Sequence, residues 1–215
     1  MKSRAMLMSK EITKEEAKAI VVKSASASTR TIIGVVGKPG GGKSTLSKYL
    51  LKEMDPTLVS VVPMDGFHLS NKVLKELGRS DRKGAQDTFD VKGFTTLIER
   101  IKMDSAYPIY YPIFDRSIEE SIAAQGVVYP STRVVIVEGN YLMHDRDGWQ
   151  EISPLLDQSW YAFLDEDLRI SRLISRHIAF GKDPESAKVW AKGSDQVNAE
   201  LIETGVGRCD FLIRS

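Results

Sequence analysis

The stretch from Gly37 to Thr45 carries the clearest chemical signal in the chain. It reads Gly-Lys-Pro-Gly-Gly-Gly-Lys-Ser-Thr and fits the pattern G-x-x-x-x-G-K-S/T without a gap, which is the signature of a loop that encloses nucleotide phosphates. Consecutive glycines let several backbone N–H groups point inward together, as a polyphosphate requires. Lys43 adds a positive charge, and Ser44 adds a hydroxyl for Mg²⁺. The predicted nucleotide-binding residues are Gly37, Pro39, Gly40, Gly41, Gly42, Lys43, Ser44 and Thr45.

The sequence on either side of this loop predicts a strand before it and a helix after it. Residues 31–36 form a short, β-branched apolar run, as a buried parallel strand requires. After the loop, Leu46, Tyr49, Leu50 and Met54 recur at helical spacing. The N-terminus of such a helix presents unpaired N–H groups and the positive end of its dipole to an anion. A chance match to the loop pattern would not be expected to lie between a predicted strand and a predicted helix. The sequence therefore predicts a nucleotide-binding protein.

Two acidic residues follow other predicted strands, at the position where parallel α/β folds place their chemistry. Asp65 comes after the apolar run 58–64, and Glu138 closes the branched run 133–137. Asp65 could accept the proton of an attacking hydroxyl as a general base, although an Asp-Gly turn at a strand end explains it equally well. Glu138 is the expected partner of Ser44 in holding Mg²⁺, directly or through water.

Three arginines recur downstream of the next predicted strand, residues 160–164. Arg169, Arg172 and Arg176 fall at i, i+3 and i+7, so they share one face of a helix that Asp165 can cap. Such a stripe is either a solvated surface or the part of a lid that reaches the transferring phosphoryl group. The sequence leaves both interpretations open.

Four other segments are predicted from composition and pattern. Residues 11–23 read as a short amphipathic surface helix that leads into a small-residue linker, and another helix is expected from residue 183 to about residue 203. The charged segment 79–87 is either a solvated loop or a flap over an anionic ligand. The aromatic, proline-containing segment 107–116 cannot be a regular central strand. As a loop it would either wall a pocket or cover the core.

The composition is that of one soluble globular domain of 215 residues. The net charge of +1 gives no electrostatic argument for nucleic acid or an anionic membrane, and no apolar run approaches the ~20 residues of a membrane span. The apolar run at residues 5–8 is too short for a secretory signal, and the single Cys209 cannot form an internal disulfide. We therefore expect a cytoplasmic protein with neither nucleic-acid nor membrane partners.

Four further motifs, together with the phosphate loop, carry a resemblance to a known family. They are Pro63–His68, Arg82–Asp90, Pro112–Arg116 and Val137–Leu142. With them the chain resembles the P-loop kinases that include phosphoribulokinase, uridine kinase and bacterial-type pantothenate kinase, over most of residues 31–214. It is most similar to a nucleoside/nucleotide kinase-like branch, also described as fructose-transport-associated kinases, of which the Asp-x-x-Asn-Ala stretch at Asp195–Ala199 is typical. Gln86, where the family usually has proline, and the lack of the Tyr-Asp and His pattern of uridine kinases argue against a specific nucleoside assignment.

The resemblance implies an α/β fold, a three-layer α/β/α P-loop NTPase sandwich with a mostly parallel, five-stranded sheet. The kinase domain would span residues 31–215, with an acceptor-binding insert at about 66–130 and a lid at about 168–195. Residues 1–30 would form an N-terminal helix and linker before it. The implied reaction is the ATP- and Mg²⁺-dependent transfer of the γ-phosphoryl group to a hydroxyl of a small metabolite. A sugar, a nucleoside, a pantothenate-like alcohol or glycerate would be compatible, and a homodimer is left open.

The resemblance also implies roles for individual residues. Asp65 would be the catalytic base, supported by Lys43 and Arg176, while Ser44 and Glu138 would hold the metal ion. Further implied contacts are those of Arg172 with the nucleotide, and of His68, Lys83, Arg116 and Tyr141 with the acceptor substrate.

Two other classes of function compete with the kinase. A nucleotide-dependent switch would hydrolyse ATP or GTP slowly and signal by conformation, but the insert from Lys83 to Arg116 looks built for an acceptor. A nucleotide-binding adaptor without turnover could lose its catalytic residues, whereas this chain retains the full set. ATP rather than GTP follows from the resemblance, and the chain contains no guanine-reading Asn-Lys-x-Asp.

Overall fold

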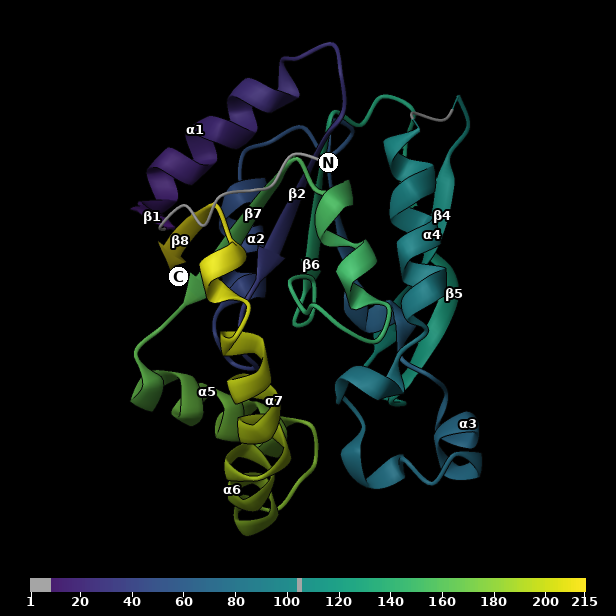
Figure 1. Ribbon diagram of the computed structural model, residues 1–215, viewed down its shortest axis with the longest axis vertical. Helices are drawn as coiled ribbons and strands as arrows, with labels where there is room; N and C mark the ends of the chain where they lie inside the picture. Colours follow the sequence, from purple (N-terminus) through teal and green to yellow (C-terminus); the bar gives the residue numbers. More distant parts are fainter. Residues whose placement is uncertain (1–8, 104–105) are drawn as a thin grey trace.

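The computed structural model describes residues 9–103 and 106–215, which are organised around a six-stranded sheet (Figure 1). The strand order is β1-β8-β7-β2-β6-β3, and every pair of neighbours runs parallel. The C-terminal ends of all strands therefore meet at one edge of the sheet, where parallel α/β folds bind their ligands. The strands are β1 (Lys10–Ile12), β2 (Thr31–Val36), β3 (Val59–Pro63), β6 (Val134–Gly139), β7 (Gln158–Phe163) and β8 (Phe211–Arg214).

The sheet has six strands rather than the predicted five, because residues 10–12 add an edge strand beside β8. The helix predicted for this segment therefore begins later, as α1 (Lys14–Ala25), with the side chain of Thr13 capping its N-terminus. An edge strand of three residues is too short to produce a recognisable sequence pattern. α1 buries Ala17 and Val21 against the sheet, so these N-terminal elements share the core of the described chain.

Helices cover both faces of the sheet and form the predicted three-layer sandwich. On one face, α1 and α2 (Lys43–Leu51) pack on a cluster that contains Ile33 of β2. On the other face, α4 (Val91–Lys102) packs Phe94 into a cluster that contains Ile32. Successive side chains of β2 point to opposite faces, as strand geometry requires. The α/β/α fold class is confirmed.

An insert between β3 and β6 stands beside the main sheet. It contains α3 (Asn71–Glu76) and an antiparallel hairpin of β4 (Ile109–Asp115) and β5 (Glu120–Val128). The segment predicted as an aromatic loop is therefore mostly strand, outside the central sheet. Pro112 is tolerated because it lies at a register shift in a two-stranded sheet. The Tyr111 hydroxyl donates to a carbonyl of β3 at 2.8 Å, which ties the hairpin to the sheet.

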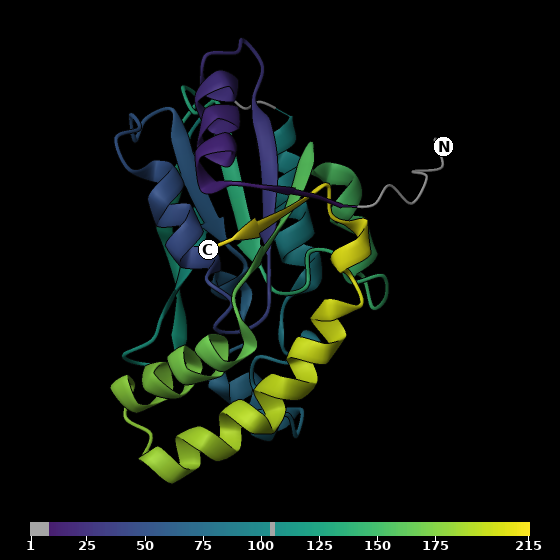
Figure 2. The same cartoon turned by 90° about the vertical axis from the view of Figure 1, so that its left-hand side faces the viewer.

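Three helices project beyond the C-terminal ends of the strands, over the range predicted as the lid, as the two views show (Figure 2). They are α5 (Glu166–Ala179), α6 (Pro184–Lys192) and α7 (Ser194–Glu203). The single helix predicted from residue 183 to about residue 203 is divided at Gly193, whose backbone leaves the helical region with φ −98° and ψ −103°. Among all helices of the described ranges, none is both long enough and apolar enough to cross a membrane.

Candidate active site

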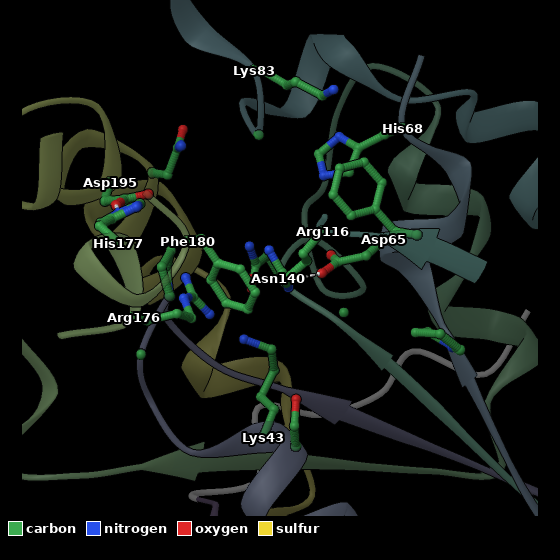
Figure 3. Close-up of a pocket in the computed structure, with 18 of the residues that line it drawn as sticks. Lys43, Asp65, His68, Lys83, Arg116, Asn140, Arg176, His177, Phe180 and Asp195 are labelled. Carbon is green, nitrogen blue, oxygen red and sulfur yellow. Dashed lines mark hydrogen bonds and ion pairs between the residues drawn. The ribbon is translucent and has the colours of Figure 1, made fainter. Parts of the chain in front are cut away.

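A cavity of about 670 Å³ lies where the strands end, enclosed by the phosphate loop, the insert and the lid (Figure 3). It brings together residues that are far apart in the chain. The predicted site residues that line it are Pro39, Gly40, Gly41, Gly42, Lys43, Ser44, Thr45, Asp65, His68, Lys83, Arg116, Glu138, Arg172 and Arg176. Two predicted residues, Gly37 and Tyr141, do not line this cavity.

The glycines of the phosphate loop are required by its backbone. Gly40 and Gly42 adopt positive φ angles of 75° and 90°, which other residues resist. Gly42 directly precedes α2, so the unpaired N–H groups of that helix begin at the cavity. Gly37 has a different task, because a Cβ there would lie 2.5 Å from the carbonyl oxygen of Ala162 in β7. It lets the loop pack closely on the neighbouring strand.

Lys43 is folded back onto its own loop. Its Nζ donates to the carbonyl oxygens of Gly37 at 2.9 Å and Lys38 at 3.2 Å. Burial lowers the pKa of Lys43 to about 8, although the carboxylates of Glu138 and Asp65 favour its charged form. The ammonium therefore sits in the cavity with only carbonyl partners, and a bound polyphosphate would stabilise its charge.

Glu138 and the start of α2 place several oxygen ligands together. Ser44 Oγ donates to one carboxylate oxygen of Glu138 at 2.5 Å, and Ser47 Oγ donates to the other at 3.0 Å. A carboxylate and a hydroxyl are hard oxygen donors of the kind Mg²⁺ prefers. No cluster of three or more His, Cys, Asp or Glu side chains suited to a metal occurs in the described residues. The donor set thus fits an Mg²⁺ that takes its remaining ligands from phosphates and water.

Asp65 faces the cavity from a short 3₁₀ segment that follows β3, and it is paired with Arg116 at the end of β4. Arg116 Nη2 lies 2.6 Å from Asp65 Oδ2. Burial alone would raise the pKa of Asp65, but nearby positive charges, Arg116 foremost, outweigh it and hold the pKa below its usual range. Gly66 makes this pairing possible, because a Cβ there would lie 2.0 Å from the carbonyl oxygen of Pro112.

His68 and Lys83 form the insert side of the cavity. The His68 ring stacks on Phe89 with centroids 4.0 Å apart, and burial lowers its pKa to about 4, so the imidazole is neutral near pH 7. Lys83 Nζ donates to Asn71 Oδ1 at 2.6 Å and lies 5.1 Å from the centre of the Phe114 ring. The charged segment around Lys83 is therefore part of the cavity wall rather than a fully solvated loop.

Tyr141 was predicted to contact the acceptor, and the structure corrects this. Only 1% of the residue is exposed, and its hydroxyl donates to the carbonyl oxygen of Gly84 at 2.7 Å. Its ring packs against Phe89 and Trp149 behind the wall. The preceding residue, Asn140, faces the cavity instead. The resemblance indicated a segment that reaches the cavity, but the side chain of this segment that lines it is Asn140 rather than Tyr141.

The arginine stripe of α5 divides between two roles. Arg172 and Arg176 line the cavity, which favours the lid interpretation over a solvated surface. Neither guanidinium has a hydrogen bond or ion pair with any other described residue. Arg169 is fully buried and donates to the carbonyl oxygen of Pro39 at 2.9 Å, so it holds the phosphate loop against α5. Asp165 occupies the predicted cap position, but its side chain pairs with Arg214 rather than with the helix.

Sequence reasoning missed a polar group in the lid. His177 Nε2 lies 2.6 Å from Asp195 Oδ2, and both residues line the cavity beside Asn198. No sequence motif assigns a role to His177. Its partner lies on another helix, so helical spacing gave no signal. The typical Asp-x-x-Asn stretch was the one available indication of this wall.

Fold and cavity together define the class of this protein. A parallel sheet with a phosphate loop at its C-terminal edge, an adjacent carboxylate and hydroxyl, and a lid with arginines is the arrangement of a P-loop phosphotransferase. The chain belongs to the phosphoribulokinase / uridine kinase family, whose model matches residues 32–189. This membership makes it a small-molecule kinase and implies ATP as the phosphoryl donor.

Individual relatives agree with this membership. A candidate uridine kinase of Schizosaccharomyces pombe is 31% identical over 198 residues, covering 86% of this chain and 83% of the relative. A pantothenate kinase of Lactococcus lactis is 30% identical over 208 residues, covering 85% and 67%. The crystal structure of a candidate fructose transport system kinase from Silicibacter sp. TM1040 superposes with a TM-score of 0.83 at 35% identity, covering 94% of this chain and 98% of that one.

Proposed function

We propose that this kinase transfers the γ-phosphoryl group of ATP, with Mg²⁺, to a hydroxyl of a small metabolite. The observation that carries the proposal is that a strand-end carboxylate, Asp65, opens on the same cavity as the phosphate loop and the lid arginines. A nucleotide-dependent switch needs no acceptor space beside its phosphates. Here the cavity continues from the loop to the insert, where His68 and Lys83 line it.

The phosphate loop and the lid would bind the nucleotide. Backbone N–H groups at the start of α2 and the Lys43 ammonium would hold the β- and γ-phosphates. Ser44 and Glu138 would hold Mg²⁺, which when bound neutralises phosphate charge. Arg172 and Arg176, which have no partner among the described residues, would bind the oxygens of the transferring group.

Asp65 would orient and deprotonate the acceptor. Its Oδ2 is held by Arg116, while Oδ1 has no hydrogen-bond partner in the described part of the chain. The acceptor hydroxyl would donate to Oδ1 as its oxygen forms a bond to the γ-phosphorus, and the bond between that phosphorus and the β–γ bridging oxygen would break. Its proton passes to Asp65, and ADP leaves. Because the pKa of Asp65 is held low, proton transfer should come late, and orientation should contribute much of the effect.

The comparisons support a small metabolite as the acceptor. The names of the relatives refer to uridine, pantothenate and fructose transport. We infer from these names and the cavity that the acceptor of this chain is a sugar, a nucleoside or a pantothenate-like alcohol.

The proposal is tested by measuring ADP formation with Mg²⁺ and a panel of sugars, nucleosides, pantothenate and glycerate. One acceptor should raise turnover by orders of magnitude over ATP alone. Asp65→Asn should then lower kcat by about 10²- to 10⁴-fold, the usual contribution of a general base. Asp167→Asn, at an exposed carboxylate of α5, is the matched control and should leave turnover unchanged. Slow hydrolysis that ignores every acceptor and is unaffected by Asp65→Asn would contradict the kinase and favour the switch.

A further inference from the structure

The cations on the insert side of the cavity already contact other groups of the protein. Arg116 is paired with Asp65 at 2.6 Å. Lys83 is held by Asn71 and by the backbone carbonyl of Glu119, and the carboxylates of Glu119 and Glu120 favour its charged form against the effect of burial. Lys182, farther out on the lid, stands over the Trp190 ring at 4.3 Å. A carboxylate or phosphate on the acceptor would have to compete with these partners for the cations.

Two cations of the cavity that have no hydrogen-bond or ion-pair partner among the described residues are Arg172 and Arg176. Arg172 and Arg176 lie on α5, the helix that Arg169 fastens to the phosphate loop through Pro39. Figure 3 shows the Arg176 guanidinium near the Lys43 ammonium, toward the loop. A nucleotide triphosphate carries enough negative charge to engage both arginines. Their charge therefore gives no reason to expect an anionic acceptor.

Two polar groups on the lid side of the cavity, here called the lid wall, have no hydrogen-bond partner among the described residues. They are a carboxylate oxygen of Asp195 and the side-chain amide of Asn198. Asp195 Oδ2 is held by His177 at 2.6 Å, but Oδ1 has no hydrogen-bond partner in the described ranges. Asn198 is only 5% exposed, lines the cavity, and makes no side-chain hydrogen bond to any described residue. In Figure 3, Asp195 and His177 lie across the cavity from Asp65 and His68.

The side-chain amide of Asn198 therefore keeps its hydrogen-bonding capacity for a ligand or water in the cavity. A carboxylate oxygen accepts from a hydroxyl, and an amide can both donate to a hydroxyl and accept from it. The same carboxylate repels a carboxylate or phosphate of a ligand. The lid wall is therefore suited to binding a hydroxyl group of the acceptor rather than a carboxylate or a phosphate.

We propose that the acceptor is an uncharged compound with at least two hydroxyls, one placed at Asp65 and another bound at the lid wall by Asp195 and Asn198. This inference rests on the proposed kinase function and names its substrate class. His177 is a positioning residue, because it fixes Asp195 through Oδ2 and leaves Oδ1 for the substrate. Carboxylic acids and sugar phosphates are excluded as preferred acceptors.

The first test compares acceptors of both kinds under identical conditions with Mg²⁺ and ATP. The neutral probes are D-fructose, D-ribose and uridine, and the anionic probes are D-glycerate, pantothenate and ribose 5-phosphate. The highest kcat/KM should belong to a neutral probe. If an anionic probe is preferred, the inference is wrong while the kinase function stands. If no probe raises ADP formation although ATP binds, the kinase function itself loses its support, and this inference falls with it.

The second test uses Asp195→Asn and Asn198→Leu with the preferred neutral probe. In each variant the loss of one hydrogen bond to the acceptor should raise the KM for the acceptor by about 10- to 100-fold. The KM for ATP should stay within about twofold of its value in the unsubstituted protein. Asp195→Asn should also raise the ratio of kcat/KM for D-glycerate to that for the neutral probe, because it removes a repelling charge. A purely structural role would not change this ratio. Asp167→Asn serves as the control, and an unchanged acceptor KM in both variants would overturn the proposal.

Discussion

Lys43→Met should abolish phosphoryl transfer and yet stabilise the nucleotide-free fold at neutral pH. The pKa of Lys43 falls from 10.5 to about 8 because its ammonium is buried. At about 1.4 kcal/mol per pKa unit, holding the charge there costs up to about 3 kcal/mol of folding free energy. Lys43→Met also removes the two hydrogen bonds from Lys43 to backbone carbonyls. The loss of these bonds reduces the gain in stability. We therefore expect a net gain of about 1–2 kcal/mol.

The pH dependence separates this reasoning from a simple gain in hydrophobicity. A lysine whose folded pKa is lowered destabilises the fold fully below about pH 8, and the cost fades as pH rises toward 10.5. The advantage of Lys43→Met in urea denaturation should accordingly be large at pH 7 and small at pH 10. Lys48→Met, at an exposed position of the same helix, is the control and should change little at either pH. An equal gain in stability at both pH values, or no gain at pH 7, would refute the explanation that the buried charge of Lys43 destabilises the fold.

Two further substitutions test the geometry around the proposed base. Arg116→Gln removes the positive charge that contributes most to holding the pKa of Asp65 low. The acidic limb of the pH profile of kcat/KM should therefore move to higher pH. An unmoved limb would show that the ion pair does not control the pKa of Asp65. Gly66→Ala places a Cβ 2.0 Å from the Pro112 carbonyl oxygen and should cost about 1–3 kcal/mol in denaturation and lower turnover, because the hairpin that carries Arg116 must shift. Gly207→Ala, which meets nothing within 4 Å, should be neutral in both assays, and equal effects at the two glycines would contradict this account.

The sheet-borne half of the site follows from local sequence and parallel topology. The phosphate loop is a contiguous pattern, and the two acids each end an apolar run. Since the C-terminal ends of parallel strands meet at one edge, residues 73 positions apart such as Asp65 and Glu138 come to line one cavity. Neither inference required knowledge of how the helices pack.

The lid and the edges of the fold were less predictable, because their contacts depend on packing between distant segments. Nothing in helical spacing indicates that Arg169 would be buried while Arg172 stays accessible, since the difference arises from contact with Pro39. The pairing of His177 with Asp195 joins α5 to α7, which are separated in the chain by α6. Strand β1 and the β4–β5 hairpin likewise depend on partners that the local sequence does not reveal.

Helix α5 links the two halves of the cavity mechanically. Arg169 joins it to the phosphate loop through the Pro39 carbonyl, and His177 joins it to α7 through Asp195. Between these contacts, Arg176 lines the cavity. A displacement of the loop on nucleotide binding would therefore reach the proposed acceptor wall through α5, and the ion pair of Lys38 with Glu203 at 3.2 Å joins the loop to α7 as well. The residues proposed to bind the acceptor lie on α7 and the insert, separate from Ser44 and Glu138. This separation agrees with relatives whose names refer to chemically different compounds.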